Sequence, residues 1–216
     1  INFATNFNLN SIDYHRCTEE DGISELTVSR DGPKQTFIPY SNSKLGWHTD
    51  GYYNQLDQQV RSMILHCAQP ATEGGVNTLF DHEIAYIMLR DENPAYIKAL
   101  MAPDCMTIPH YLQRQICTGP VFLVDPLSAK LQMRYTARKH NIVWKDDVLT
   151  TQAINFLTNI LKAPESPVFI HKFEAGQGLI TNNVLHNRTA FNDDPLKPRL
   201  VYRARFFDRI TVNKTL

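Results

Sequence analysis

Short runs of β-forming residues, each ended by a turn signal, recur along this chain and limit its fold more than any other feature. Gly, Pro, Asn and Asp clusters such as Asp31-Gly32-Pro33-Lys34 separate the runs. We predict strands at 23–30, 35–39, 60–69, 76–80, several within 104–135, and at 168–173, 179–181 and 200–207. The runs at 60–69 and 76–80 are separated by Glu73-Gly74-Gly75, which predicts a hairpin.

Three segments follow a helical pattern instead. Asp81 is a suitable N-cap for a helix over 82–90, and Asn93 followed by proline predicts a second helix over 94–101. Residues 146–161 carry one apolar stripe at helical spacing. Many short strands with about three helices favour a mainly β fold, an antiparallel sandwich or barrel with flanking helices.

Composition excludes several classes of partner. The 216 residues carry 22 basic and 22 acidic side chains, which favours neither nucleic acid nor an acidic membrane as partner. No apolar run has the length of a membrane span. We expect one domain over 1–216, reduced cysteines and a cytoplasmic location. The start at Ile1 shows no signal peptide. It also lacks an initiator Met, which leaves open a missing natural N-terminal segment, and a homo-oligomer stays open as well.

The segment Trp47-His48-Thr49-Asp50 places an imidazole and a carboxylate two residues apart. In a strand these two side chains point to the same face, so they can reach one common point. With a second histidine they form the facial set that binds Fe(II) in non-haem oxygenases. The best candidate is His186. A lone His-x-Asp also arises by chance, so the pair gains weight only from the residues that accompany it.

The run at 200–207 separates two faces. One is apolar and typical of a core: Leu200, Tyr202, Ala204 and Phe206. The other carries guanidinium groups at Arg199, Arg203 and Arg205. Such a face is either solvated or lines an anion-binding cavity, where a planar guanidinium can bind a carboxylate through two hydrogen bonds. Arg199 and Arg203 lie about 13 Å apart on an extended strand, so they serve two anions or converge only through their side chains.

The order of these motifs resembles the taurine-dioxygenase-like family of Fe(II)/2-oxoglutarate-dependent dioxygenases, over about residues 45–207. The resemblance includes His48-Thr49-Asp50, the proline-to-threonine segment 70–78, and Arg199. Residues 185–191, Leu-His-Asn-Arg-Thr-Ala-Phe, are similar to a Leu-His-Gly-Arg-Thr-x-Phe segment of the butyrobetaine and clavaminate branches. The motifs are specific together, although each alone is not.

The resemblance implies a double-stranded β-helix, or jelly-roll, with flanking helices. It implies Fe(II) ligands at His48, Asp50 and His186, and a site for the distal carboxylate of 2-oxoglutarate at Thr78 and Arg199. It places Arg203 near an anion of the substrate or co-substrate. The implied reaction consumes O2 and hydroxylates an aliphatic C–H of a small anionic or zwitterionic substrate, with succinate and CO2 as co-products.

Four further residues are candidates for substrate binding. Tyr52, Tyr53 and Asn54 follow the first metal motif, so they either line the substrate side or pack at its rim. Arg205, together with Arg203, favours a carboxylate or sulfonate substrate.

The chain departs from the family pattern at two places. Thr181-Asn182-Asn183 stands where relatives often have Asp-Asn, and Asn187 replaces a glycine. Both changes bear on hydrogen bonds around the ligands. Two alternatives remain: a cupin-like metalloenzyme that does not use 2-oxoglutarate, and a non-catalytic small-molecule-binding barrel. Thr78 with Arg199 favours the dioxygenase, because a dicarboxylate requires an anion clamp.

Overall fold

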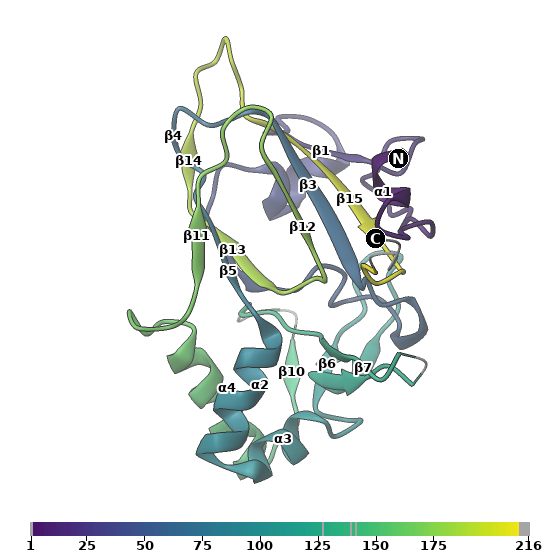
Figure 1. The fold of residues 1–216 in the computed structure, drawn as a ribbon, viewed down its shortest axis with the longest axis vertical. Coiled ribbons are helices and arrows are strands. Elements are labelled where there is room, and N and C mark those ends of the chain that lie inside the picture. Colours follow the sequence, from purple (N-terminus) through teal and green to yellow (C-terminus); the bar gives the residue numbers. More distant parts are fainter. Residues whose placement is uncertain (1, 127, 139, 141, 212–216) are drawn as a thin grey trace, which may run out of the picture.

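The computed structural model describes residues 2–126, 128–138, 140 and 142–211. Two β-sheets make up one half of the molecule, and three helices with several short strands make up the other (Figure 1). No helix in this described part is long and apolar enough to cross a membrane.

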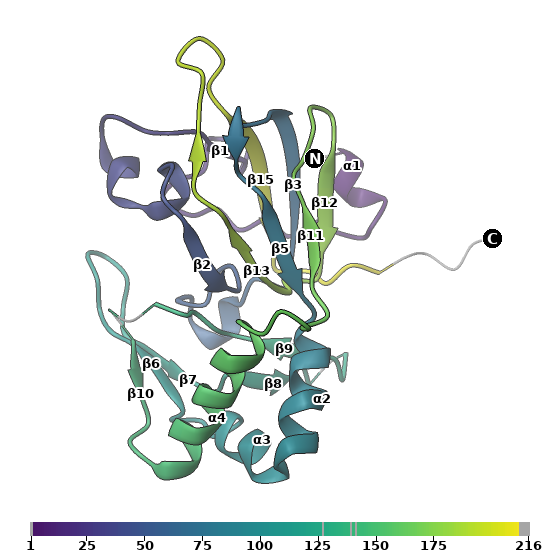
Figure 2. The same cartoon turned by 90° about the vertical axis from the view of Figure 1, so that its left-hand side faces the viewer.

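The two main sheets each contain four antiparallel strands. The first has the order β1-β15-β3-β12, from Ser24–Leu26, Leu200–Phe206, Ser62–Gln69 and Gly178–Thr181. The second has the order β11-β5-β13-β2, from Phe169–His171, Asn77–Phe80, Leu185–Arg188 and Leu45–His48. One sheet lies behind the other in Figure 2, and the chain passes repeatedly between them. This is the jelly-roll, or double-stranded β-helix, which confirms the predicted fold class.

The helices α2, α3 and α4 lie at one end of the two sheets (Figure 2). α2 (His82–Glu92) and α3 (Pro94–Leu100) begin at the predicted caps, because Asp81 and Asn93 accept hydrogen bonds from Glu83 N and Ala95 N. α4 (Val148–Ile160) is capped by Asp147. Its stripe is only partly buried, since Val148 is 71% exposed. The largest apolar cluster joins these helices to Phe80 and Leu185, the residues of β5 and β13 at that end of the second sheet.

Smaller elements complete the chain. The short strands are β4 (Glu73–Gly74), β6 (Met106–Ile108), β7 (Cys117–Gly119), β8 (Phe122–Val124), β9 (Leu131–Met133), β10 (Val143–Trp144) and β14 (Phe191–Asn192). The short helical turns are α1 (Asn2–Thr5), η1 (Pro33–Thr36), η2 (Ile38–Tyr40) and η3 (Leu56–Gln58).

Two predictions of local structure are wrong. Residues 35–39 lie in two 3-10 turns joined by an extended Phe37, because proline occupies the start of each: Pro33 is the first residue of η1 and Pro39 the second of η2. The run at 60–69 does not form a hairpin with 76–80, since β3 and β5 belong to different sheets. Gly74 makes the crossing possible with φ of +69°, in a place where a Cβ would lie 2.1 Å from the Ala190 carbonyl oxygen.

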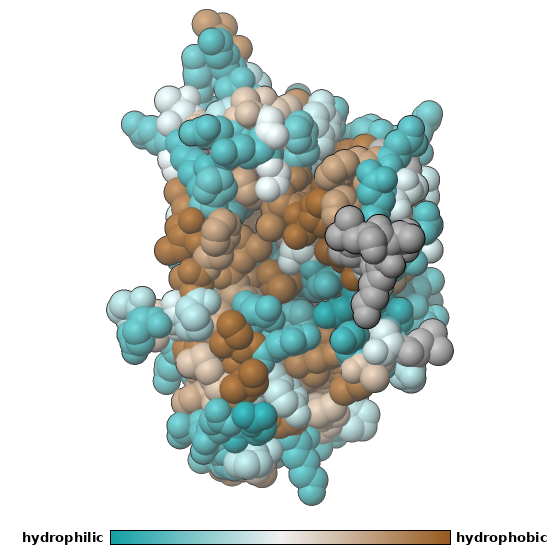
Figure 3. All heavy atoms as spheres, in the orientation of Figure 1, coloured by the Kyte–Doolittle hydropathy of each residue, from teal (hydrophilic) through white to brown (hydrophobic). Residues whose placement is uncertain are grey.

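The second sheet ends in an exposed edge. Phe169 and Ile170 on β11 are 59% and 62% exposed. Figure 3 shows hydrophobic side chains gathered across the middle of this face, where β11 and β12 lie. An uncovered apolar edge strand is a common place for contact with another chain. A homo-oligomer stays a prediction.

The last strand, β15, turns its arginine face inward, which is one of the two alternatives that the sequence left open, whereas its apolar face is less buried than expected. Val201, Arg203 and Arg205 are buried and face the space between the sheets. Leu200, Tyr202 and Ala204 are only partly buried, on the outer side. The arginine face is therefore the inner face, because β15 lies between β1 and β3 and its inward side chains are enclosed by the second sheet.

Candidate metal centre

Two neighbouring strands bring the two histidines together. β13 pairs antiparallel with β2, and His186 lies directly opposite His48. Opposite residues in such a pair project from the same face. The two imidazole centroids lie 4.2 Å apart. A separation of 138 residues in sequence thus becomes a contact through strand register.

Backbone carbonyls hold both imidazoles in one tautomer. His48 Nδ1 lies 2.9 Å from the Gly46 carbonyl oxygen, and His186 Nδ1 lies 2.9 Å from that of Val184. A carbonyl can only accept, so each Nδ1 carries the proton and each Nε2 has a free lone pair. Both Nε2 atoms face Asp50 Oδ1, at 3.6 and 4.0 Å. This is how proteins orient histidines that bind a metal ion.

Asn183 fixes the backbone that carries the carboxylate. Its Oδ1 accepts from Asp50 N at 2.7 Å, and its Nδ2 donates to the carbonyl oxygens of Asp50 and Val60 at 2.9 and 2.7 Å. Asn183 has φ of +55°, a left-handed conformation that asparagine tolerates better than most residues. Asn183 therefore places Asp50 although it lies 133 residues away in sequence.

The Asp50 carboxylate stays ionised inside the protein. Burial alone would raise its pKa, but the Arg203 guanidinium at 3.1 Å, followed by the hydrogen bond with His48, outweighs burial and lowers the pKa well below its usual range. Burial, followed by the charge of His48, lowers the pKa of His186 to about 3. One anionic and one firmly neutral donor thus share the site, as a divalent cation requires.

The three side chains fit one metal ion. Their ligand atoms all lie within 4.8 Å of one another, and they form the predicted group of His48, Asp50 and His186. Asp50 Oδ1 faces both imidazoles, whereas Oδ2 is buried, forms no hydrogen bond and lies 3.1 Å from Arg203 Nη1. Two imidazole nitrogens and one carboxylate are the ligand set of mononuclear non-haem Fe(II).

A cavity of about 600 Å³ adjoins His48 and Asp50. Tyr52 and Tyr53 line it, with their rings perpendicular and their centroids 5.2 Å apart. Asn54 does not line it; its Nδ2 donates to the Gln58 carbonyl within the following turn. Of the two alternatives that the sequence left open, Tyr52 and Tyr53 line the cavity, whereas Asn54 closes the following turn.

The structure brings Arg203 and Arg205 to this cavity, both already paired with acidic groups. Arg203 contacts Asp50. Arg205 contacts Asp13 and donates to the Tyr53 hydroxyl at 3.0 Å. Burial would lower the pKa of Arg205, but the charges of Tyr53, Asp50 and Asp13 together raise it. Neither guanidinium is free to receive a substrate anion without giving up a buried ion pair.

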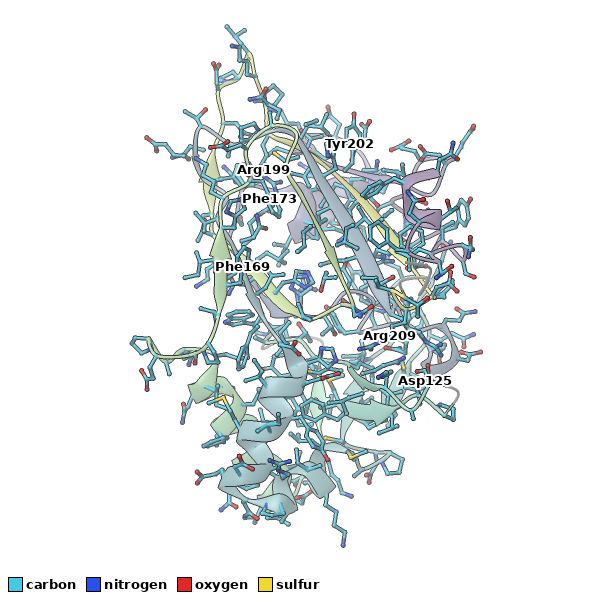
Figure 4. The ribbon with its side chains drawn as sticks, in the orientation of Figure 1. Asp125, Phe169, Phe173, Arg199, Tyr202 and Arg209 are labelled. Atoms are coloured by element: carbon cyan, nitrogen blue, oxygen red, sulfur yellow. The ribbon has the colours of Figure 1, made fainter. Side chains whose placement is uncertain are left out.

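Arg199 lies elsewhere in the barrel, at the start of β15 (Figure 4). It is 5% exposed and donates to the Leu26 carbonyl at 3.4 Å. Arg188 on β13 approaches it, and both guanidinium groups lie over the Phe191 ring, at 4.6 and 5.1 Å. Burial, followed by the charge of Arg199, lowers the pKa of Arg188 to about 10. This buried pair of cations is suited to an anion.

The structure does not bring Thr78 to this pair. Thr78 lies opposite Asn187, whereas His186 lies opposite Leu79 and Arg188 lies opposite Asn77. Thr78 therefore points to the outer side of the second sheet, and Asn77 takes the inward position. The sequence missed Asn77, Arg188 and Asn183; the inward role of Asn77 depends on a register that no sequence motif marks.

A jelly-roll that presents two histidines and one carboxylate beside a cavity defines the class of non-haem iron oxygenases. The family described as taurine catabolism dioxygenase TauD, TfdA family matches residues 1–205. The chain belongs to this family of Fe(II)- and 2-oxoglutarate-dependent dioxygenases.

Two curated relatives, both named uridine-5'-phosphate dioxygenase, are similar in sequence. The protein from Streptomyces sp is 26% identical over 195 residues, which cover 86% of this chain and 70% of the relative. The protein from Amycolatopsis sp is 28% identical over 170 residues, which cover 74% and 60%.

Solved structures share the fold. An asparagine oxygenase in complex with Fe(II), 2S,3S-3-hydroxyasparagine and succinate has a TM-score of 0.64 and 16% identity, covering 85% of this chain and 56% of that one. The non-haem iron oxygenase OrfP in complex with Fe and alpha-ketoglutaric acid has a TM-score of 0.65 and 16% identity, covering 91% and 60%. The chain thus spans less than two thirds of the length of these two structures.

Proposed function

We propose that this chain is an Fe(II)- and 2-oxoglutarate-dependent dioxygenase that hydroxylates an aliphatic C–H of a small anionic molecule, with succinate and CO2 as co-products. The observation that carries the proposal is the convergence of His48, Asp50 and His186 beside a cavity of about 600 Å³. That volume is typical of a site for a small molecule. The bound iron supplies oxidation by O2, which no protein side chain performs.

The protein's own groups prepare the reaction. The carbonyls of Gly46 and Val184 keep both Nε2 atoms unprotonated, and Arg203 keeps Asp50 ionised. Tyr52 and Tyr53 form an aromatic wall that positions the substrate and limits the entry of water.

We place the distal carboxylate of 2-oxoglutarate at Arg199 and Arg188. Both guanidiniums are buried, and neither forms an ion pair within 4.0 Å in the described part of the chain. A carboxylate between them would relieve their mutual repulsion. Asn77, directly opposite Arg188, replaces Thr78 as the neutral donor in this arrangement.

The names of the curated relatives make uridine-5'-phosphate the first substrate to assay. Its anionic phosphate agrees with a cavity lined by three arginines that form no ion pair within 4.0 Å among the described residues, namely Arg16, Arg114 and Arg138. Amino acids and sulfonates complete the panel, and stimulated release of succinate identifies the substrate.

Anaerobic titration with Fe(II), with and without 2-oxoglutarate, tests the proposed chemistry. We expect a weak visible charge-transfer band only when both are present. His186→Ala and Asp50→Ala should abolish the band and the formation of succinate. Iron binding with no effect of 2-oxoglutarate would favour a cupin-like enzyme, and no iron binding at all would favour a non-catalytic barrel.

A matched set of variants tests the co-substrate site. Arg199→Ala should raise the 2-oxoglutarate concentration needed for half-maximal rate. Asn77→Ala should raise it as well, whereas Thr78→Ala should leave it unchanged. The opposite result for the last two would restore Thr78 to the role that the sequence motif suggests.

A further inference from the structure

The cavity beside the metal ligands carries an excess of positive charge at its mouth. Asp50 is the one carboxylate that lines it within the described part of the chain. The two inner arginines are compensated, since Arg203 contacts Asp50 and Arg205 contacts Asp13. The three outer arginines, Arg16, Arg114 and Arg138, form no ion pair within 4.0 Å among the described residues. The uncompensated charge therefore lies at the mouth.

Arg114 is held in place without a carboxylate. Tyr111 and Arg114 exchange two backbone hydrogen bonds of 3.0 and 3.1 Å, which close a tight loop. The guanidinium lies over the rings of Tyr53 and Tyr111, at 4.8 and 5.8 Å. Its Nε is buried without a hydrogen-bond partner. Cation–π contacts fix such a group while its N–H donors remain available to an anion.

Arg138 reaches the same aromatic wall from another segment. Its Nη1 lies 3.4 Å from the Tyr52 hydroxyl. Residues 135–137 pair with the strand that carries the first histidine, through Thr49 N to Tyr135 O and Ala137 N to Trp47 O. Arg138 is therefore anchored to the metal-binding strand although its side chain is at the exposed rim. Arg114 and Arg138 thus each contact one ring of the same aromatic pair, Tyr53 and Tyr52 respectively.

We infer that Arg114 and Arg138 form an anion subsite that binds the phosphomonoester group of the substrate. This inference rests on the proposed function, which makes the cavity the substrate-binding site. A phosphomonoester carries nearly two negative charges at neutral pH and accepts several charge-assisted hydrogen bonds. Two uncompensated guanidiniums match that charge, and Arg16 at the same mouth adds to the attraction. Arg203 and Arg205, which the sequence suggested for the substrate anion, instead hold the cavity wall and Asp50.

Binding of three probes to the metal-free chain tests this inference separately from catalysis. Uridine-5'-phosphate, uridine and inorganic phosphate are titrated by calorimetry into the wild type, Arg114→Gln, Arg138→Gln and the double variant. We expect each single variant to bind uridine-5'-phosphate about tenfold more weakly or worse, because each removes a charge-assisted contact. Binding of uridine should not change between wild type and variants, whatever its strength.

Controls separate this effect from general charge and from misfolding. Arg90→Gln removes an exposed arginine that pairs with Asp91 on α2, outside the cavity, and should leave all three affinities unchanged. Arg114→Lys and Arg138→Lys keep the charge and should recover part of the affinity. Urea unfolding identifies any variant that has lost the fold.

Three results would overturn the inference. Folded glutamine variants that bind uridine-5'-phosphate as tightly as wild type would remove both arginines from the site. If the glutamine variants bound uridine as much more weakly as they bind uridine-5'-phosphate, the two arginines would contribute to the shape of the site and not to its charge. Tighter binding of a carboxylate or sulfonate than of any phosphate, lost in the same variants, would replace the proposed ligand class. The visible band of the iron and 2-oxoglutarate complex should persist in both glutamine variants, so failure of the proposed chemistry would be seen independently.

Discussion

Replacing Asn183 with alanine should weaken both the fold and the metal centre, because this side chain supports the backbone of a ligand. The substitution leaves three buried backbone groups without their partner: Asp50 N, Asp50 O and Val60 O. Each buried polar group left unpaired costs about 1–3 kcal/mol. The position also has φ of +55°, where alanine costs about 1 kcal/mol more than asparagine or glycine.

These terms give a loss of about 4 kcal/mol or more for Asn183→Ala, against a total stability of about 5–15 kcal/mol for a folded domain. Asn183→Gly removes the same hydrogen bonds but relieves the backbone, so it should be about 1 kcal/mol more stable than the alanine variant. The difference between the two variants isolates the conformational contribution from the hydrogen bonds.

Urea unfolding of the metal-free protein measures the stability, and anaerobic titration with Fe(II) measures the affinity of the ion. We expect the iron affinity to fall about 10–100-fold in both variants, because the support of a ligand has been removed. Asn182→Ala is the matched control. Its Oδ1 accepts one hydrogen bond, from Ile210 N at 2.9 Å, and it should leave iron affinity unchanged.

A loss below about 1 kcal/mol in Asn183→Ala would refute the assigned hydrogen bonds. A large loss of stability with wild-type iron affinity would refute the positioning role, because the ligand would then be placed by other contacts. The same loss of iron affinity in Asn182→Ala would make the effect regional rather than specific to Asn183.

Buried groups away from the metal ligands lead to three shorter predictions. Arg134→Met should lower the free energy of unfolding in urea by about 3 kcal/mol or more, because it removes the guanidinium that donates to the buried carbonyls of Tyr52, Met106 and Cys117. A smaller loss would contradict this role. Burial, followed by the charge of Arg205, lowers the pKa of His15 to about 3, so the free energy of unfolding should fall as pH drops from 6.5 towards 3. His15→Gln should flatten this pH dependence. An unchanged dependence in the variant would exclude His15 as its source. Burial raises the pKa of Cys105 to about 11, and the four buried thiols should react with a disulfide reagent only after denaturation.

The three side chains of the candidate metal centre could be predicted from sequence because their residue types and order are specific to one chemistry. A strand places His48 and Asp50 on a common face whatever the rest of the fold does. His186 joins these two residues because its strand, β13, pairs directly with β2, the strand that carries His48. The supporting contacts could not be predicted in the same way, since Asn183 acts on Asp50 through a turn with positive φ.

The co-substrate position depends on strand register, which a motif does not specify. A shift of one residue moves every side chain of a strand to the opposite face. Gly74 and Gly75 both have positive φ shortly before β5, a backbone conformation that few other residues adopt. This conformation determines which residues of β5 face the inside of the barrel. Asn77 and Thr78 are equally suitable by residue type, and only the pairing of β5 with β13 separates them.

The failed hairpin has a related cause. Two β-forming runs joined by a short glycine-containing loop usually pair with each other. Here the loop contains its own short strand, β4, which pairs with β14 and carries the chain from one sheet to the other. Local signals specify that the chain turns, whereas the choice of partner depends on which strand edge is already filled. β3 is enclosed by β15 and β12, so β5 has no place beside it.

The alternation in β15 was ambiguous for an energetic reason. Period-two spacing of arginines is the same on a solvated face and on a buried one, and buried guanidiniums are costly unless they are paired. The described structure resolves the ambiguity residue by residue, since Arg203 and Arg205 each face an acid.

Arg199 is buried beside Arg188, and its positive charge lowers the pKa of Arg188. The Asp193 carboxylate offsets part of this repulsion, since it raises the pKa of both arginines, and a dicarboxylate bound beside them would offset more of it. The same reasoning applies to Arg114 at the mouth. We therefore propose two separate anion positions: one at Arg188 and Arg199 inside the barrel for the co-substrate, and one at Arg114 and Arg138 at the mouth of the cavity for the substrate.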